Sequence, residues 1–161
     1  MSPIIKAPKR FVRPLRPQEW GEAMQMVWRV FLRFEADEYS LDGVQNFYHF
    51  ITDDLLYMMY KQGVYRVFAA FEGRKLIGMI SIRDGNHISL LFVDEDYHHQ
   101  GIGRALMRYL CDLLVAEGRE TFVTVHSSPY AVDFYHKMGF RDTDGEKKQA
   151  GIIFTPMQFF L

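Results

Sequence analysis

The sequence predicts a mixed α/β domain, and three observations indicate this fold class. Apolar residues at helical spacing alternate along the chain with runs typical of β-strands. A strong turn at Asp84-Gly85 lies between strand-like runs in the middle of the chain. With 161 residues, 48% of them hydrophobic and 16% aromatic, the chain can bury a core as one compact domain. We therefore expect a single domain over residues 1–161, with residues 1–10 as a flexible N-terminal extension.

The first part of the chain predicts one strand followed by helices. The strand covers residues 11–15, and a helix starts at Pro17, because the first helical position tolerates the missing N–H of proline. Two further helices are expected over residues 44–51 and 54–61, the second ending near Gly63. The apolar stripe of the first helix consists of Trp20, Met24, Val27, Trp28 and Phe31.

Three antiparallel strands are expected next, over residues 64–71, 75–83 and 87–93. The second and third are joined at Asp84-Gly85, since glycine accepts the positive φ that hairpin turns need. The end of the third strand, residues 90–93, is apolar on both faces, which is typical of a central strand covered on both sides.

The last part of the chain alternates helices and strands. A helix over residues 101–117 has one apolar face and ends at Gly118. A strand over residues 121–125 follows, and then a helix opened by Ser128-Pro129 as N-cap and first-turn proline and closed at Gly139. The last strand covers residues 152–160 and is expected to be interrupted at Pro156.

Charge and cysteine content argue against several classes of protein. Lys and Arg number 19 against 20 Asp and Glu, for a formal net charge of −1, so we expect no nucleic-acid partner. Cys111 is the single cysteine, which leaves no intrachain disulfide and no cysteine-based metal site. Residues 1–10 do not form the apolar stretch of a secretory signal, and no apolar run reaches the roughly 20 residues of a membrane span. We expect a cytoplasmic protein without a metal or a membrane partner.

The stretch from Leu90 to Leu106 is the segment for which the sequence predicts chemistry. A buried strand runs into a short turn, and Gly101 and Gly103 then open an amphipathic helix. The first turn of a helix leaves N–H groups unpaired, and the helix dipole makes that end positive. The glycines remove side chains that would keep an anion from the backbone, so a phosphate can bind there. The alternative is that they only allow a tight turn against the sheet.

Two common nucleotide-binding patterns do not fit this segment. It lacks the third glycine and the early βαβ placement of a dinucleotide fold, and it lacks the Gly-Lys-Ser/Thr of a P-loop. The turn instead follows an antiparallel meander, and a strand–helix unit ending in Tyr135-x-x-x-Gly139-Phe140 comes after it.

The run Val93–Leu106 resembles motif A of the GNAT superfamily of N-acetyltransferases, whose usual form is Gln or Arg, two variable residues, Gly, one variable residue, then Gly or Ala. The run Ser127–Phe140 resembles motif B. The element order from Phe11 to Phe160 is also similar, so the resemblance covers nearly the whole chain. The sequence departs from the family pattern at His98, where Gln or Arg is usual, and at Ser128, where many relatives have an Asn that contacts the cofactor.

The resemblance implies a mostly antiparallel central sheet flanked by helices, and direct transfer of acetyl from acetyl-CoA to a primary amine of a small molecule or peptide. It implies that the backbone of residues 91–93 holds the pantetheine arm and that residues 99–104 hold the pyrophosphate. The residues implied to bind the cofactor are Leu91, Phe92, Val93, His98, His99, Gln100, Gly101, Ile102, Gly103, Arg104 and Ser128.

The resemblance also implies catalytic roles. The family commonly uses the tyrosine of motif B, here Tyr135, to protonate the departing thiolate. A core aromatic with its hydroxyl at the rim is the alternative. For the base, His87 is the first candidate, because strand alternation places it on the face of Leu91, and a similar His serves in arylalkylamine acetyltransferase relatives. His126, at the end of the next strand, is the second.

An acidic segment between the first helices lies where relatives build the acceptor side. Its carboxylates can attract a cationic amine, although a solvated loop with helix N-caps is the alternative. The acidic residues are Glu35, Asp37, Glu38 and Asp42.

Other functions stay open at this point. A non-catalytic regulatory domain that binds CoA or acyl-CoA would keep the two glycines without needing Tyr135. A user of longer acyl chains and a pure interaction module are further alternatives. The apolar end of the last strand predicts a homodimer; its residues are Met157, Phe159, Phe160 and Leu161.

Overall fold

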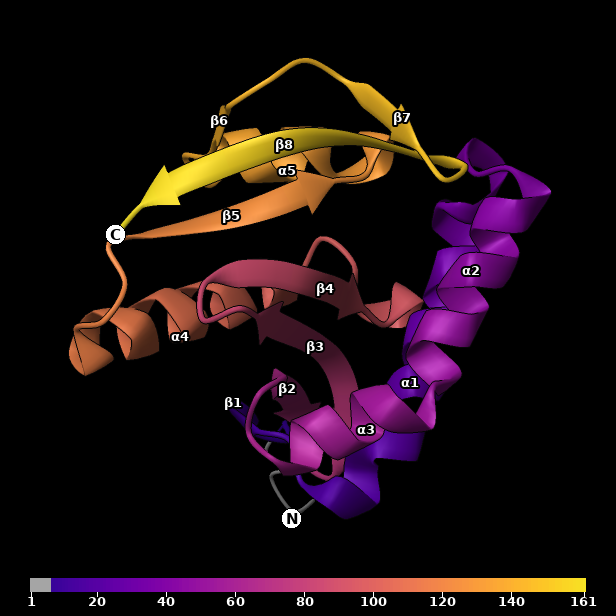
Figure 1. Cartoon of the computed structure of the whole chain (residues 1–161). Coiled ribbons are helices and arrows are strands. Elements are labelled where there is room, and N and C mark those ends of the chain that lie inside the picture. Colours follow the sequence, from indigo (N-terminus) through magenta and orange to yellow (C-terminus); the bar gives the residue numbers. More distant parts are fainter. Residues whose placement is uncertain (1–6) are drawn as a thin grey trace, which may run out of the picture.

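The computed structural model describes residues 7–161, and its elements follow the expected order (Figure 1). The helices are α1 (Trp20–Phe34), α2 (Leu41–Thr52), α3 (Asp54–Lys61), α4 (Ile102–Glu117) and α5 (Val132–Lys137). Short 3₁₀ turns are η1 (Pro17–Glu19), η2 (Ala36–Glu38), η3 (Glu95–Tyr97) and η4 (Pro129–Ala131). The strands are β1 (Arg10–Pro14), β2 (Arg66–Glu72), β3 (Lys75–Arg83), β4 (His87–Val93), β5 (Phe122–Ser127), β6 (Arg141–Asp142), β7 (Lys147–Gln149) and β8 (Ile152–Phe160).

Helix boundaries follow from local chemistry that the sequence carries. Ser40 caps α2 by accepting a hydrogen bond from Gly43 N at 3.1 Å, and Asp53 caps α3 by accepting from Leu55 N at 2.9 Å. These contacts satisfy N–H groups that would otherwise lack a partner at the helix start. Gly118 ends α4 in the left-handed conformation, as expected for a glycine at that position.

The strands form a mixed sheet in the order β1-β2-β3-β4-β5-β8-β6, with β7 also paired to β8. All neighbouring strands are antiparallel except β4 and β5, which confirms the mostly antiparallel sheet. The parallel pair is short: only His87↔Thr124 and Ile88↔Val125 are in register. Beyond Ile88 the two strands diverge, and Figure 1 shows β5 and β8 separated from the end of β4.

Helices cover both faces of the sheet. The helices α1, α2 and α3 pack on one face around Val27 and Phe31, each 0% exposed. On the other face, α4 and α5 pack around Leu106 and Leu110, also 0% exposed. Two clusters of buried apolar side chains therefore enclose the central strands, as the apolar run at the end of β4 predicted.

A β-bulge in β4 changes which side chains face each layer. Ile82 pairs with Ile88 and Ser81 with Leu90, so Ser89 is the extra residue. As a result Ile88 packs on the α4 side together with Leu91, although the two residues are three apart. The predicted position of His87 on the face of Leu91 is therefore wrong, because the bulge lies between them and His87, next to Ile88, lies on the opposite face.

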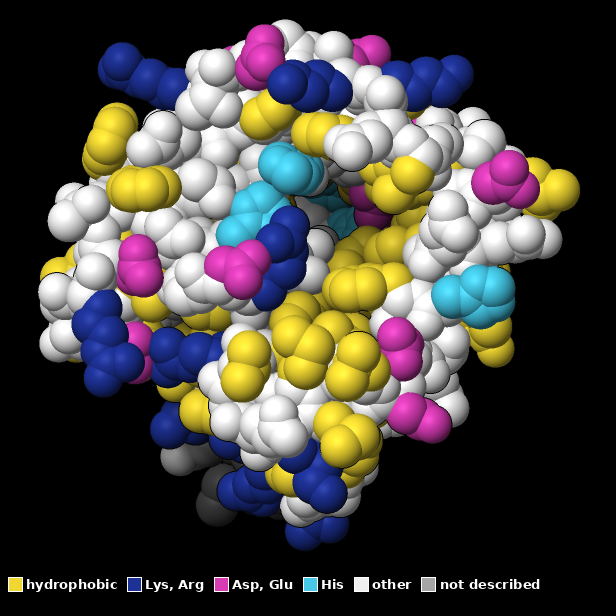
Figure 2. All heavy atoms as spheres, viewed as in Figure 1, with side chains coloured by type: hydrophobic (Ala, Val, Ile, Leu, Met, Phe, Trp, Pro, Cys, Tyr) yellow, Lys and Arg dark blue, Asp and Glu magenta, His cyan; other side chains and the backbone are white. Residues whose placement is uncertain are grey.

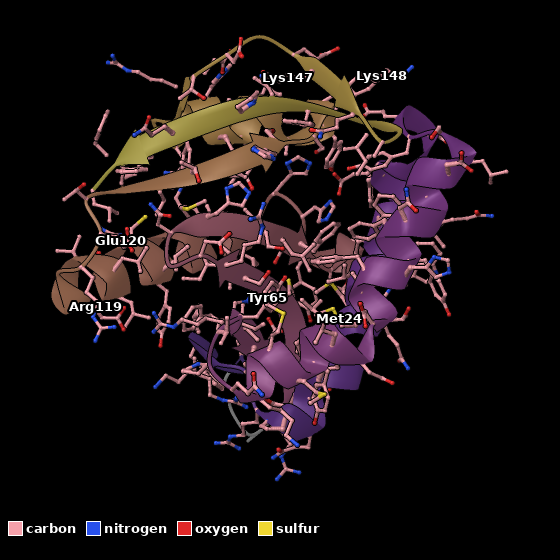
Figure 3. The ribbon with its side chains drawn as sticks, viewed as in Figure 1. Met24, Tyr65, Arg119, Glu120, Lys147 and Lys148 are labelled. Carbon is pink, nitrogen blue, oxygen red and sulfur yellow. The ribbon has the colours of Figure 1, made fainter. Side chains whose placement is uncertain are left out.

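Tyr65 stabilises this bulge from the loop between α3 and β2 (Figure 3). Its side chain is 1% exposed, and its hydroxyl donates to Ser89 Oγ at 2.9 Å while it is 2.6 Å from Ser81 Oγ. Because a phenol has one proton, Ser81 is the donor in the shorter bond. The two serines flank the irregular point of the β3–β4 ladder, so Tyr65 ties both strands to the α1 layer.

The C-terminal strand differs from the expected one. It is continuous through Pro156, which pairs with His126 of β5, and the Pro156 carbonyl accepts a hydrogen bond from Thr143 N at 2.9 Å. The short strands β6 and β7, which the sequence pattern did not indicate, pair with β8. Both consist of two or three mostly charged or polar residues, too few to produce a strand pattern.

The apolar end of β8 is largely buried within the chain. Met157 is 1% exposed, and the ring of Phe159 stacks on Phe140 with 5.3 Å between centroids. Phe160, at 71%, is the strongly exposed member of the set on which the homodimer was predicted. The end of β8 therefore offers less exposed apolar area for self-association than the sequence suggested.

The last residue of the expected N-terminal extension, Arg10, belongs to the sheet. Residues 1–6 lie outside the described residues, but Arg10 already belongs to β1 and pairs with Glu72. The Arg10 Nε to Glu72 Oε2 distance is 2.7 Å, and the Lys9 carbonyl accepts a hydrogen bond from Gly73 N at 2.8 Å. Among residues 7–161, none of the helices combines the length and apolar character required to cross a membrane.

Candidate active site

A cavity of about 670 Å³ lies where β4 and β5 diverge. Residues from α1, α2, β4, the start of α4, β5 and α5 line it, so segments far apart in the sequence meet in one space. Figure 2 shows a hollow at the centre of this face, with histidine side chains beside it and hydrophobic side chains below. The implied cofactor residues that line the cavity are Leu91, Phe92, Val93, His98, His99, Gly101, Ile102, Gly103, Arg104 and Ser128.

The turn before α4 exposes backbone to this cavity. His99 and Gly101 both have left-handed backbone, with φ of 61° and 80°. A Cβ on Gly101 would have no atom within 4 Å, so the space beside it is open. Left-handed residues in a turn orient successive N–H groups into an anion-binding concavity, and α4 adds the positive end of a 16-residue helix. The turn thus fits a diphosphate group.

Gly103 has a different reason to be glycine than the sequence suggested. A Cβ there would lie 3.2 Å from Cε2 and 3.3 Å from Cζ of Phe134, which is closer than ordinary van der Waals contact. Gly103 lines the cavity, but its missing side chain first of all allows α4 to approach the aromatic ring on α5. The expectation that a side chain at Gly103 would point at the phosphates is therefore corrected.

The side chains of His98 and Gln100 make hydrogen bonds that connect the turn to neighbouring strands. His98 Nε2 donates to the Val93 carbonyl at 2.8 Å, and its ring lies 4.8 Å from that of Phe34. Gln100 is exposed and does not line the cavity in the described structure; its Oε1 accepts from Arg10 Nη2 at 2.7 Å. His98 therefore fastens the turn to the end of β4, and Gln100 fastens it to β1.

The β4 edge that faces β5 is available along the cavity. The β4–β5 pairing ends at Ile88, whereas Leu91, Phe92 and Val93 beyond it line the cavity. On the other side these residues pair with β3, so the backbone stays extended. An extended ligand can add to such an edge through main-chain hydrogen bonds.

Tyr135 lies at the inner end of the cavity on α5. Its side chain is 4% exposed, and its ring makes edge contacts with Phe134 at 5.3 Å and Phe140 at 5.2 Å. Burial raises the pKa of the phenol well above its ordinary value of 10, and the nearby Glu35 charge raises it further. The phenol is therefore protonated at every ordinary pH and able to donate a proton.

The two candidate histidines lie together, but only one faces the cavity. His126 lines the cavity and is exposed, and its ring stacks on Phe154 at 4.5 Å. The ring of His87 lies 4.7 Å from that of His126, and its Nδ1 is 2.7 Å from Thr124 Oγ1. Among the described residues, His87 is outside the cavity lining, so His126 is closer than His87 to where a base would be needed.

His87 is expected to make folding stability depend on pH. Burial, followed by the charges of Arg83 and His126, lowers its pKa from 6.5 to about 4, against the smaller opposing effect of Asp84. Because the folded pKa is depressed, the unfolded chain binds more protons between these values, and stability is lost as the pH falls from 6.5 through 4. His87→Gln removes this dependence. Between about pH 7.5 and about pH 5, we expect the wild type to lose about 2 kcal/mol more unfolding free energy than the variant in urea titrations.

Equal pH dependence of the wild type and His87→Gln would contradict this assignment. Partial loss of solvent, followed by the charges of Arg83 and Lys147, also lowers the pKa of the more exposed His126, so His126→Gln is the comparison variant and is expected to change the pH dependence of stability less. The difference in pH dependence of the unfolding free energy between the two variants gives the contribution of the more buried imidazole, that of His87.

Glu35 is the cavity residue that sequence reasoning undervalued. The sequence offers two interpretations of the acidic segment, attraction of an amine or a solvated loop. In the structure the Glu35 side chain is half-buried and lines the cavity, whereas Asp37, Glu38 and Asp42 are exposed. A signal was present in the sequence: Glu35 lies four residues after the fully buried Phe31, which is the spacing of the apolar stripe of α1. An acidic residue on that stripe points toward the interior rather than toward solvent.

The fold and the cavity together define an acyltransferase of the GNAT type, and comparisons with known proteins agree. Residues 35–161 match the family model described as acetyltransferase (GNAT) domain. Peptidyl-lysine N-acetyltransferase YjaB of Salmonella typhimurium is 30% identical over 132 residues, which cover 82% of this chain and 83% of that protein. The chain therefore belongs to the GNAT family and is a GNAT-type N-acetyltransferase.

Solved structures show the same fold. A GCN5-related N-acetyltransferase from Rhodopseudomonas palustris aligns over 100% of both chains with a TM-score of 0.80 at 22% identity. The PaiA N-acetyltransferase from Thermoplasma acidophilum, solved in complex with coenzyme A, aligns over 95% of this chain and 99% of that chain, with a TM-score of 0.78 at 16% identity. The predicted fold class is thereby confirmed.

Proposed function

We propose that this chain transfers the acetyl group of acetyl-CoA directly to a primary amine, with a lysine side chain of a peptide as the acceptor class. The observation that carries the proposal is the single cavity that joins the anion-binding turn, the open edge of β4 and the buried phenol of Tyr135. A bound acetyl-CoA needs these three features: a binding site for its phosphates, an extended surface that binds its pantetheine arm, and a proton donor for its thiolate leaving group.

The bound acetyl-CoA would supply an activated acyl group, and this chain would position it. The N–H groups at the start of α4 and around Gly101 would hold the pyrophosphate, with Arg104 beside them. The backbone of residues 91–93 would hold the pantetheine arm. PaiA, which has the same fold, was solved in complex with coenzyme A, and this supports coenzyme A as the class of cofactor.

Direct transfer, without an acyl-enzyme, is supported by the position of Cys111. This cysteine lies on α4, half-buried against the sheet, and is outside the cavity lining of the described residues. Burial raises the pKa of its thiol to about 11, so the nucleophilic thiolate is scarce at neutral pH. The amine itself is then the group that attacks the thioester.

The name of the relative YjaB supports the acceptor class, since that protein is a peptidyl-lysine N-acetyltransferase. The cavity also opens to the surface beside exposed residues such as His126 and Tyr130, so a peptide side chain can enter while its backbone stays outside. A long, flexible lysine side chain suits this arrangement.

Incubation with acetyl-CoA and a panel of amines tests the proposal. We expect a lysine-containing peptide to gain one acetyl group by mass spectrometry, with equivalent release of free CoA thiol, and the same peptide with arginine in place of lysine to gain none. Cys111→Ser should keep the activity. If CoA binds in calorimetry but no polyamine, amino acid or peptide is acetylated, the chain is a CoA-binding regulatory domain instead.

A further inference from the structure

We propose that Glu35 accepts the proton that the acceptor ammonium must lose before it attacks, an inference that rests on the proposed amine acetylation. A primary alkylamine is protonated at neutral pH, and its nitrogen is a nucleophile only after it has given up that proton. The role therefore needs an ionisable side chain inside the cavity, close to the proton donor Tyr135.

The fold holds Glu35 at this place. Its N–H donates to the Phe31 carbonyl at 2.9 Å as the last hydrogen bond of α1, and Glu38 N donates back to the Glu35 carbonyl at 3.0 Å. The residue is thus fixed between α1 and η2, with its side chain at the cavity. Backbone hydrogen bonds on both sides of Glu35 therefore fix the position of this residue.

Glu35 is not committed to an ion pair. Within residues 7–161, the salt bridges of the structure do not include it. The nearby acids behave differently: Asp94 pairs with Arg29 at 2.9 Å, and Glu95 contacts Arg33 at 3.3 Å. A half-buried carboxylate without a cationic partner is costly unless a ligand supplies the charge. A cationic amine does so.

The electrostatic surroundings of Glu35 suit a base. Loss of solvent raises the pKa of its carboxyl, the Glu38 charge raises it further, and a hydrogen bond from Ser128 opposes both effects. A carboxylate whose pKa moves toward neutrality is a better proton acceptor than an ordinary one. Ser128, at the position where relatives have the cofactor-binding Asn, thus lines the cavity together with the acid in this chain.

Several phenols share the cavity with Glu35. Tyr39, Tyr130 and Tyr135 line the same cavity as Glu35, and the Glu35 charge raises the pKa of each phenol. Aromatic faces and phenol oxygens around a carboxylate form a site for a cation. The other titratable residues that line the cavity are Tyr97, His98, His99, Arg104, His126 and Lys137.

The transfer of the acetyl group from sulfur to nitrogen requires the amine to lose two protons and the thiolate to gain one. Glu35 takes one proton from the ammonium, and the freed nitrogen lone pair attacks the thioester carbonyl carbon. The C–N bond forms, and the C–S bond breaks with its electron pair leaving on sulfur, which takes the phenolic proton of Tyr135. The second proton lost by nitrogen restores the phenol, and the proton on Glu35 passes to solvent.

Glu35→Gln tests the proposal in the full chain, because it keeps the shape and hydrogen-bonding capacity and removes the proton acceptor. With a lysine peptide as acceptor, we expect kcat to fall by about 10²-fold, the lower part of the range for one general base. The acid limb of the kcat–pH profile should disappear, while CoA affinity by calorimetry stays unchanged. Glu35→Asp should keep the limb and part of the rate.

Asp37→Asn is the matched control, since Asp37 is an exposed acid of the same 3₁₀ turn and should leave rate and pH profile unchanged. Retention of kcat, or of the acid limb, in Glu35→Gln overturns the proposal, and so does a rise in KM with kcat intact. Loss of the limb in His126→Gln instead would assign the base to His126. A wild type that acetylates no amine contradicts the proposed function and not this assignment.

Discussion

Tyr135→Phe is expected to slow acetyl transfer by roughly 10²–10⁴-fold with little change in CoA affinity. The substitution removes one hydroxyl and keeps the ring, whose contacts with Phe134 and Phe140 hold α5 in place. If the hydroxyl protonates the departing sulfur, the loss appears in kcat, because that interaction exists mainly in the transition state. Single-turnover acetylation of the peptide and CoA calorimetry measure the two quantities separately.

Burial of the Tyr135 phenol determines how the acetylation rates of the wild type and of Tyr135→Phe compare as the pH changes. An ordinary phenol would produce an alkaline limb near pH 10, but the Tyr135 pKa is raised above that value. The sign of the shift keeps the proton on the phenol as the pH rises, so the wild type should show no decline due to Tyr135 below about pH 10. The rate ratio of wild type to Tyr135→Phe should therefore stay constant across the neutral range.

Tyr109→Phe serves as the control, because it removes a phenol from α4 that packs on Phe68 outside the cavity lining of the described residues. Its rate should match the wild type. Wild-type turnover in Tyr135→Phe, under conditions where chemistry limits the rate, would make Tyr135 a structural residue and leave the proton donor to water or another group.

Gly101→Val should weaken CoA binding by at least about tenfold, equal to ~1.4 kcal/mol. Gly101 has φ of 80°, and a side chain added there would extend into the open space beside the turn, where an anion must approach the backbone. The left-handed backbone also costs a branched residue about 1–2 kcal/mol of folding stability. Calorimetry with CoA measures the affinity, and thermal unfolding measures the strain.

The chain offers a matched control for this strain at the other end of the same helix. Gly118 has φ of 70°, and a Cβ there also meets no atom within 4 Å, but it does not line the cavity in the part of the chain that the structure describes. Gly118→Val should lose comparable stability and keep CoA affinity. If both variants bind CoA like the wild type, the turn before α4 is not the phosphate site.

The order of the main elements and the glycine turn before α4 could be predicted from the sequence. The strands over residues 75–83, 87–93 and 152–160 and the helix over residues 54–61 have the predicted bounds, since periodicity, caps and turn glycines act within a few residues of each other. Asp84-Gly85 adopts positive φ at both positions, as its hairpin role required. The two family motifs could also be found in the sequence, because each is a continuous run of 14 residues.

The arrangement of the site depends on long-range pairing and packing, which local patterns do not encode. A single extra residue at Ser89 reverses the face of His87 relative to Leu91, because strand side chains alternate and one slip inverts them. The contact of Gly103 with Phe134 depends on how α4 meets α5, 31 residues further along the chain by their numbering. Glu35 becomes a cavity residue only because the end of α1 meets β4, η4 and α5 where β4 and β5 diverge. The sequence by itself determined the main helices and strands and the glycine turn before α4. The tertiary structure decided which acid and which phenol share a cavity with that turn, because burial and proximity arise only when distant segments pack together.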